Sequence, residues 1–438
     1  MTPEFHFNNK NVFTRGNRFL ILLTILSLFL ASNNTFASAS DDKQIEKRLI
    51  NGIRKKGGKV ELTNDGKIDS VILTKSRITD TDIKDISICT SLHTLVLNNT
   101  NVTDAALGHI KALRSLQALA LHSTKITDDG LKHIEHMNSL KILVLSNTII
   151  GDSGLMHLQK LVQLREIHLR NTRIGDQGLE YIKDLTHLSA LDLSNTNISN
   201  NGLAKLRNLN DIESIWLDGT RVANDCLNLI LTWKHLKNIS LCDTSISDSG
   251  LRKLPNFEKL QSLNLRSTSV TDASLATVIS RLSNLQYLNV SDTRVADKGL
   301  KHLAKLPKLS TLDLAMTAIS DDGLVYLARL TKLQKLSLVS TKISDAGLSQ
   351  LTELNLLCFL GLSNNNITSE GVKHIYRLPK LEYLSLAYTQ VDDDSVGYFV
   401  KMPAISRVIL AHTRFSANGL SRMQRELPKL IITTDLHP

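Results

Sequence analysis

A short pattern of aliphatic residues recurs at a fixed spacing through most of this 438-residue chain. One copy reads LHTLVLNNTNVTD (residues 92–104), and fifteen copies follow one another in phase. Every step between successive copies has the same length, except that the step from Leu260 to Leu285 is one position longer. Each copy forms one structural unit that cannot bury its apolar face alone and must stack on its neighbours. The copies start at Ile68, Leu92, Leu116, Leu140, Leu164, Leu188, Ile212, Leu236, Leu260, Leu285, Leu309, Leu333, Leu357, Leu381 and Ile405.

Within each copy the spacing of the apolar residues changes from two to three. Leu95 and Leu97 alternate with other residues, as in a β-strand, so we expect them to face the core. We expect the residues between them to face solvent. The GLxxLxxL spacing that follows predicts a short helix or 3-10 turn. We expect Asp104 and its equivalents to be the N-caps of these helices, and the Gly two residues later to serve a tight turn. The Thr100 column is expected to bond the loop backbone of a neighbouring copy.

The consensus LxxLxLxxTxITDxGLxxLxxL resembles the leucine-rich repeat family, whose units run 20–29 residues. Its ITDxGL phrase is similar to repeats of secreted planctomycete-type bacterial proteins and to repeats of F-box adaptors. The resemblance covers residues 68 to about 430. It implies an α/β solenoid, a horseshoe with a concave parallel sheet of about 15 strands and convex short helices. The expected boundaries are a signal peptide at 1–39, an N-terminal cap at 40–67, repeats at 68–417 and a C-terminal cap at 418–438.

Positions 1–39 have the pattern of a secretory signal. Basic residues at positions 10, 15 and 18 precede an apolar run from Phe19 to Ala31, and Ala37-Ser38-Ala39 has the small side chains of a cleavage site. The run is short for a membrane-spanning helix, which needs about 20 apolar residues. We therefore expect cleavage after Ala39 and export to the periplasm, the cell envelope or the exterior. An uncleaved anchor is the alternative, and membrane contact is expected only through this signal.

Composition excludes several classes of protein. Leucine is the most frequent residue, aromatic residues are only 4% and charged residues are 21%, which fits neither a disordered chain nor a multi-span membrane protein. The net charge of +10 falls to +8 without the signal. The basic residues are scattered among Asp and Glu and form no stripe with aromatic residues, so we expect no nucleic acid partner.

Catalytic and metal-binding motifs are not found in the sequence. It contains no G-x-S-x-G, P-loop, H-E-x-x-H or dinucleotide fingerprint, and its four cysteines lack metal-ligand spacing. His109, His133 and His157 share one helix column, but Tyr181 and Tyr326 occupy the same column, which favours an amphipathic position over a metal ladder. We expect no enzyme, no catalytic residue, no cofactor and no metal. No segment resembles an F-box, so a ubiquitin-ligase adaptor is a remote alternative.

The concave sheet is the expected binding surface, because solenoids present extended concave faces to their partners. Large side chains are few there, and aromatic and Arg side chains dominate interface energetics. We expect a protein partner. The alternative is a structural or adhesive envelope component that binds glycan or assembles with itself. The candidate partner-binding residues are Trp216, Tyr287, Met316, Phe359, Tyr383 and Tyr388, with a second group at Arg165, His168 and Arg170.

Overall fold

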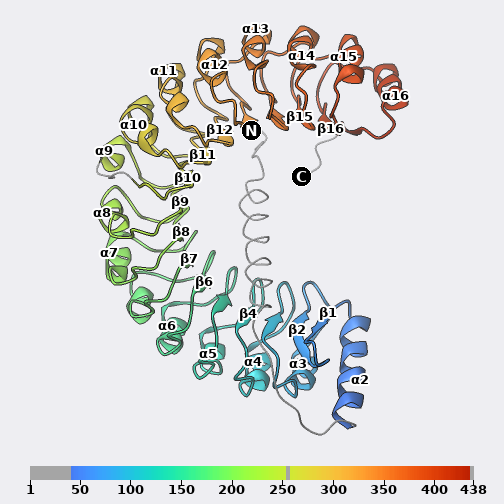
Figure 1. Cartoon of the computed structure of the whole chain (residues 1–438). Helices are drawn as coiled ribbons and strands as arrows, with labels where there is room; N and C mark the ends of the chain where they lie inside the picture. Colours follow the sequence, from blue (N-terminus) through green and yellow to red (C-terminus); the bar gives the residue numbers. More distant parts are fainter. Residues whose placement is uncertain (1–40, 253–256, 435–438) are drawn as a thin grey trace. The chain divides into compact units, whose positions relative to one another are not determined.

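The computed structural model describes residues 41–252 and 257–434, so the expected signal peptide at 1–39 lies outside the described residues. The chain divides into two compact units, Met1–His168 (unit 1) and Leu169–Pro438 (unit 2). Figure 1 shows that in each unit the strands lie along one side and the helices along the other. Among the described residues, no helix is long and apolar enough to span a bilayer.

Unit 1 begins with a helix and an antiparallel strand pair, after which every strand is parallel to the one before it. Its elements are α2 (Asp41–Lys55), β1 (Lys59–Leu62), β2 (Ile68–Ile72), α3 (Asp80–Ile86), β3 (Thr94–Val96), α4 (Asp104–Ile110), β4 (Ala118–Ala120), α5 (Asp128–Leu131), β5 (Ile142–Val144), α6 (Asp152–Leu155), η2 (Met156–Leu158) and β6 (Glu166–His168).

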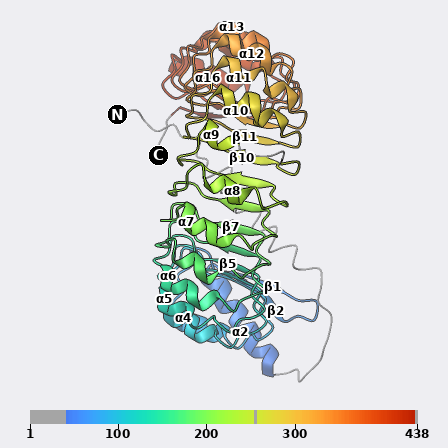
Figure 2. The same cartoon turned by 90° about the vertical axis from the view of Figure 1, so that its left-hand side faces the viewer.

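Unit 2 continues the alternation of three-residue strands and short helices, and its strands pair in parallel from β7 to β17. Figure 2 views its helix side, with α8 to α10 toward the reader. The elements are η3 (Gly178–Tyr181), β7 (Ala190–Asp192), α7 (Asn200–Leu203), η4 (Ala204–Leu206), β8 (Ser214–Trp216), α8 (Cys226–Ile230), β9 (Asn238–Ser240), α9 (Asp248–Leu251), β10 (Ser262–Asn264), α10 (Asp272–Thr277), η5 (Ile279–Arg281), β11 (Tyr287–Asn289), α11 (Asp297–Leu300), η6 (Leu303–Lys305), β12 (Thr311–Asp313), α12 (Asp321–Leu327), β13 (Lys335–Ser337), α13 (Asp345–Leu348), η7 (Ser349–Leu351), β14 (Phe359–Gly361), α14 (Ser369–Ile375), β15 (Tyr383–Ser385), η8 (Asp393–Ser395), α15 (Val396–Lys401), β16 (Arg407–Ile409), α16 (Ala417–Glu426) and β17 (Ile431–Thr433).

The leucines of the repeat form the core between the strand layer and the helix layer. Leu95 and Leu97 are fully buried, and so are Leu360 and Leu384 in unit 2. Each repeat buries the same aliphatic columns, so the parallel strand-and-helix solenoid predicted from the sequence is confirmed within each unit. The side of the strands opposite this core is called the sheet face below.

The threonine of each repeat closes the turn after its own strand. Thr100 donates its hydroxyl to the Leu97 carbonyl at 2.6 Å, and Thr317 donates to the Leu314 carbonyl at 2.5 Å. The expectation that this column bonds a neighbouring repeat was wrong, because the hydroxyl reaches the carbonyl three residues earlier in the same turn. Asn365, which replaces Thr, does join neighbours, since its amide donates to the Leu338 carbonyl at 2.7 Å.

In most repeats that have it, the consensus aspartate is the first residue of a helix, and the expectation that it is the N-cap was wrong for most helices. In α13 the N-cap is Ser344, the residue before Asp345. The aspartate instead bonds the next repeat. Asp321 accepts hydrogen bonds from the backbone N–H and the hydroxyl of Ser344, at 2.8 and 2.5 Å. Equivalent contacts to the next repeat, which together form the Asp ladder, start from Asp80, Asp104, Asp128, Asp176, Asp248, Asp272, Asp297, Asp345 and Asp393.

This Asp ladder also explains the glycine two residues after the aspartate position. A methyl group on Gly347 would overlap the Asp321 Oδ1 atom of the preceding repeat. The glycine is therefore required by the close approach of a carboxylate, since its own backbone conformation is not left-handed.

The turn after each strand contains one residue with a positive φ, at a position that the sequence pattern did not reveal. Met316 has φ of 57° and Tyr388 has 55°, although such residues rarely adopt the left-handed region. Asn, Asp and Ser occupy most equivalent positions, because their short polar side chains tolerate this conformation. The recurrence at the same place in successive repeats shows that the turn is a fixed part of the repeat.

We predict that Gly347→Ala lowers the free energy of unfolding by about 2 kcal/mol or more, because the new methyl group displaces the Asp321 carboxylate from Ser344. Urea unfolding followed by circular dichroism measures this change. Gly397→Ala in α15 is the matched control, since a methyl group there meets no atom within 4 Å. An equal loss in both variants would contradict the carboxylate contact as the cause.

Candidate partner-binding surface

Strand register brings several candidate residues of unit 2 into one column of the sheet face. Tyr287 pairs with Thr311, which pairs with Lys335, and the same column continues through Phe359, Tyr383 and Arg407. Lys335 and Arg407 are exposed, whereas the three aromatic residues are half-buried. Phe359 and Tyr383 are therefore neighbours in this column. Lys335 lies on one side of the pair and Arg407 on the other.

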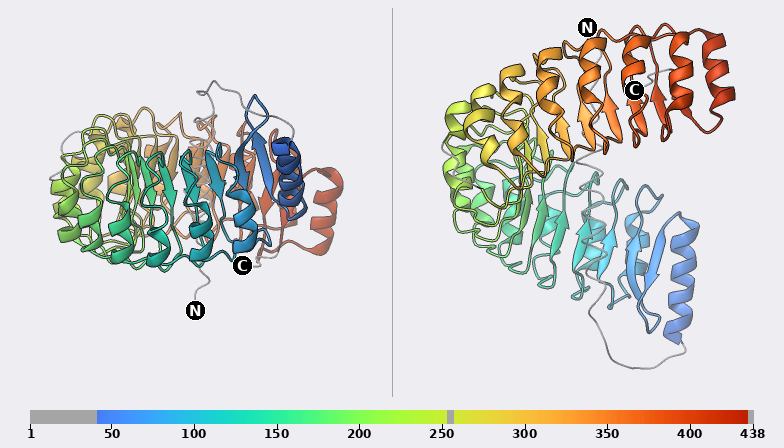
Figure 3. Two further views of the ribbon diagram at one scale, coloured as in Figure 1. Left: turned by 90° about the horizontal axis from the view of Figure 1, so that it is seen from below. Right: turned by 45° about the horizontal axis from the view of Figure 1, so that its top comes forward.

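The aromatic side chains of the last repeats form two stacked pairs. The rings of Phe359 and Tyr383 have centroids 4.5 Å apart with planes at 12°, and the rings of Tyr388 and His412 have centroids 4.3 Å apart at 23°. Burial raises the pKa of Tyr383. Figure 3 (right) shows β14 to β16 side by side in this part of unit 2. We call Phe359, Tyr383, Tyr388 and His412 the aromatic cluster.

Sequence reasoning missed His412 as a member of this cluster. The available signal was its spacing, because it occupies the position of Tyr388 in the next repeat. Both residues lie in the left-handed turn, with φ of 55° and 56°, which fixes the direction of their side chains. The turn thus contributes binding candidates beside those on the strands.

Trp216 and His168 are less accessible than expected. Trp216 is only 6% exposed and His168 only 3%, and each is the last residue of a three-residue strand, between two residues that face the core. This position is buried in most repeats, as Asn289 at 0% illustrates. The expectation that this position faces solvent was wrong for most repeats, because its side chain is buried there.

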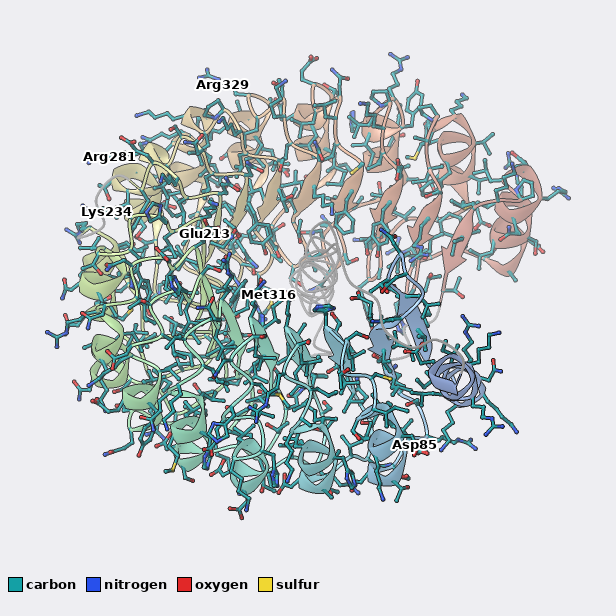
Figure 4. All side chains as sticks on the ribbon, turned by 60° about the horizontal axis from the view of Figure 1, so that its bottom comes forward. Asp85, Glu213, Lys234, Arg281, Met316 and Arg329 are labelled. Atoms are coloured by element: carbon teal, nitrogen blue, oxygen red, sulfur yellow. The ribbon has the colours of Figure 1, made fainter. Side chains whose placement is uncertain are left out.

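The second candidate group does not form one site within either unit. Arg165 and His168 belong to unit 1, where His168 Nε2 lies 3.5 Å from Glu166 Oε2. Arg170 belongs to unit 2, where its charge acts on the Asp218 carboxyl. Met316 is 48% exposed at a left-handed turn, and Figure 4 shows it on the strand side, away from Lys234 and Arg281 on the helix side.

Acidic residues that the sequence did not single out lie on the same sheet face. Burial raises the pKa of Asp218 to about 6, with a contribution from the Asp192 carboxylate, against hydrogen bonds from Ser240 and Cys242. Burial also raises the pKa of Asp313 to about 6, while the backbone N–H of Ala315 and the charge of Arg266 act in the opposite direction. The carboxyl groups of Asp218 and Asp313 therefore titrate at mildly acidic pH.

Side chains that could bind a metal ion do not gather in the part of the chain that the structure describes. No set of three or more His, Cys, Asp or Glu side chains there could hold a metal ion. Burial raises the pKa of the Cys89 and Cys226 thiols to about 12, so both are protonated at neutral pH. A protonated, buried thiol is a poor nucleophile.

Parallel strands on one side, short helices on the other and a fixed repeat length define a repeat solenoid of the α/β class. Residues 67–327 match the family model described as a leucine-rich repeat region, and residues 329–352 match a second model described as a leucine rich repeat. The first match alone covers more than half of the sequence, so the chain belongs to the leucine-rich repeat family. No curated protein matches it in sequence.

Solved structures with this fold include bacterial and plant proteins. A leucine-rich repeat protein of Leptospira interrogans is 23% identical with a TM-score of 0.56, covering 81% of this chain and 87% of its own. The HAESA receptor kinase ectodomain of Arabidopsis, solved with an IDA peptide hormone, is 13% identical with a TM-score of 0.51, covering 89% and 77%. An internalin of Listeria monocytogenes is 17% identical with a TM-score of 0.43, covering 90% and 95%. At these identities the likeness shows the fold alone.

We predict that the free energy of unfolding falls as pH rises from about 4 to about 6. The folded state retains protons on Asp218 and Asp313 that the unfolded state, with carboxyl pKa values near 3.8, releases in this window. The contribution is on the order of 2 kcal/mol per group. Urea unfolding at several pH values should show this slope reduced in Asp218→Asn and Asp313→Asn. The Asp322→Asn variant, at an exposed position of α12, is the control and should keep the slope of the unchanged protein. The same unchanged slope in Asp218→Asn and Asp313→Asn would contradict the assignment.

Proposed function

We propose that this protein is exported, is not an enzyme, and binds a protein partner through the sheet face of unit 2. The leucine-rich repeat fold commonly serves protein binding, and the aromatic cluster is the observation that carries the proposal for this chain. Aromatic side chains supply large contact area at low entropic cost and are frequent hot spots in interfaces. Lys335 and Arg407, which flank Phe359 and Tyr383 in the same column, add exposed cations beside the rings.

The sheet face of unit 2 is rigid, so its side chains need little ordering when a partner binds. The rings of Phe359 and Tyr383 are held on strands whose opposite side is a fully buried leucine column. Asp345 and Asp393 of the Asp ladder bond the repeats that follow them in this part of unit 2. A surface that is preformed loses little conformational entropy when it binds. The HAESA ectodomain, a protein of the same fold, was solved with a peptide hormone, which supports an extended peptide or protein segment as the type of ligand.

Export rests on the pattern of residues 1–39. We predict that the protein recovered from the envelope or medium of its host begins at Ser40. N-terminal sequencing measures this directly. Recovery of a chain that retains Met1 and fractionates with membranes would contradict cleavage and would favour an uncleaved anchor.

The binding surface is tested with two matched double variants. We predict that Phe359→Ala with Tyr383→Ala lowers affinity for the partner by at least about tenfold, because two anchors are removed. The partner is first isolated by affinity capture from the host envelope and identified by mass spectrometry. Affinity is then measured by calorimetry with the purified partner.

The control variant is Tyr181→Ala with Tyr326→Ala, which removes two half-buried rings from the helix side. Its affinity should stay within about twofold of the unchanged protein. Equal losses in both variants would contradict the sheet face as the binding surface. Capture that disappears after deglycosylation of the envelope fraction would favour the glycan-binding alternative.

A further inference from the structure

The exposed side of α2 is lined by cations. The side chains of Lys47, Arg48, Arg54 and Lys55 are all exposed or half-exposed. At 100° per residue they fall, together with Asn51, within about 120° of the helix circumference. No acidic residue lies on this arc, and none of the four cations forms an ion pair within the described residues. We call these four residues the basic face of α2.

The opposite side of α2 is used for packing. Ile53 is 5% exposed, and Leu49 and Ile50 are half-buried. Glu46 lies on this inner side, close enough to Cys89 for its charge to contribute to the raised thiol pKa. Figure 1 shows α2 at the end of unit 1, beside β1 and α3. The packing therefore holds the basic face away from the repeats.

The described acidic side chains of α3 and of the region around β1 form no ion pair with this face. Asp82 on α3 is paired with Lys56, which follows the helix. Asp85, also on α3, is exposed, and Figure 4 shows it on the outer side of unit 1. Glu61 and Asp65 lie on and after β1, and Asp65 is 3.9 Å from Lys67. The four cations thus remain available to a ligand of opposite charge.

We infer that the basic face of α2 docks on an anionic phospholipid surface. Charge complementarity favours such a surface, because four cations spaced over about 12 Å of one helix face suit a plane of negative charge.

Each cation near an anionic bilayer contributes about a fivefold gain in partitioning. The test uses the exported chain that begins at Ser40 and vesicles of phosphatidylcholine with and without about one third phosphatidylglycerol, at physiological salt. The readout is the ratio of binding to anionic and neutral vesicles, because contacts that do not depend on charge contribute to both. The ratio for the unchanged protein should be about ten or more.

The variant Lys47→Gln, Arg48→Gln, Arg54→Gln, Lys55→Gln should lower this ratio at least about fivefold. The control variant Lys111→Gln, Lys132→Gln, Lys160→Gln, Lys301→Gln removes the same charge from exposed positions on or beside the helix side and should change it less than about twofold. Melting temperatures equal to that of the unchanged protein verify that the variants are folded. A milder double variant, Lys47→Gln with Lys55→Gln, should give a ratio between those of the unchanged protein and the fourfold variant.

Three outcomes would overturn the inference. A ratio for the α2 variant within twofold of the unchanged protein would show that the face is not used. Equal losses in the α2 and control variants would show a response to net charge alone. Binding to soluble polyphosphate without a preference for anionic vesicles would assign the face to a polymer.

Discussion

The contact between the aspartate of one repeat and the helix N-cap of the next is the interaction on which the rest of the structure depends. Each carboxylate accepts from a backbone N–H and usually from a hydroxyl, as Asp345 does from Thr368 at 2.8 and 2.6 Å. The same carboxylate leaves no room for a side chain at the following glycine position. The consensus has Asp in one column, Ser or Thr in a second and Gly in a third. All three follow from this one contact between repeats. Stacking in register follows, because a repeat shifted along its neighbour would lose both hydrogen bonds.

Close stacking also limits what the sheet face can display. The core-facing positions are taken by leucine and other aliphatic residues, and the last position of most strands is buried, as it is at Ser240, Asn264 and Asn289. Larger side chains are accessible at the first strand position and in the left-handed turn. The aromatic cluster occupies those two positions. Asp313 occupies a covered position, and burial raises the pKa of its carboxyl.

Much of the fold could be predicted from the sequence, because the strand and helix periods are local and repeat fifteen times. The family, the core leucines and the column shared by Tyr287, Phe359 and Tyr383 required only the spacing. The roles of Asp321 and Thr100 could not be predicted, since they depend on which neighbour a short side chain reaches. The burial of Trp216 does not follow from strand alternation, which places it opposite the core, and the stacking of Tyr388 on His412 depends on a backbone conformation that no composition rule reveals.

The central claim, that the aromatic cluster is the binding surface, is tested most directly by hydroxyl-radical footprinting of the protein with its isolated partner. The oxidation of Phe359, Tyr383 and Tyr388 should fall on binding, because the partner covers their rings. The oxidation of Tyr181 and Tyr326 on the helix side should stay unchanged. Protection of the helix-side tyrosines, with the cluster still oxidised at its free rate, would contradict the account.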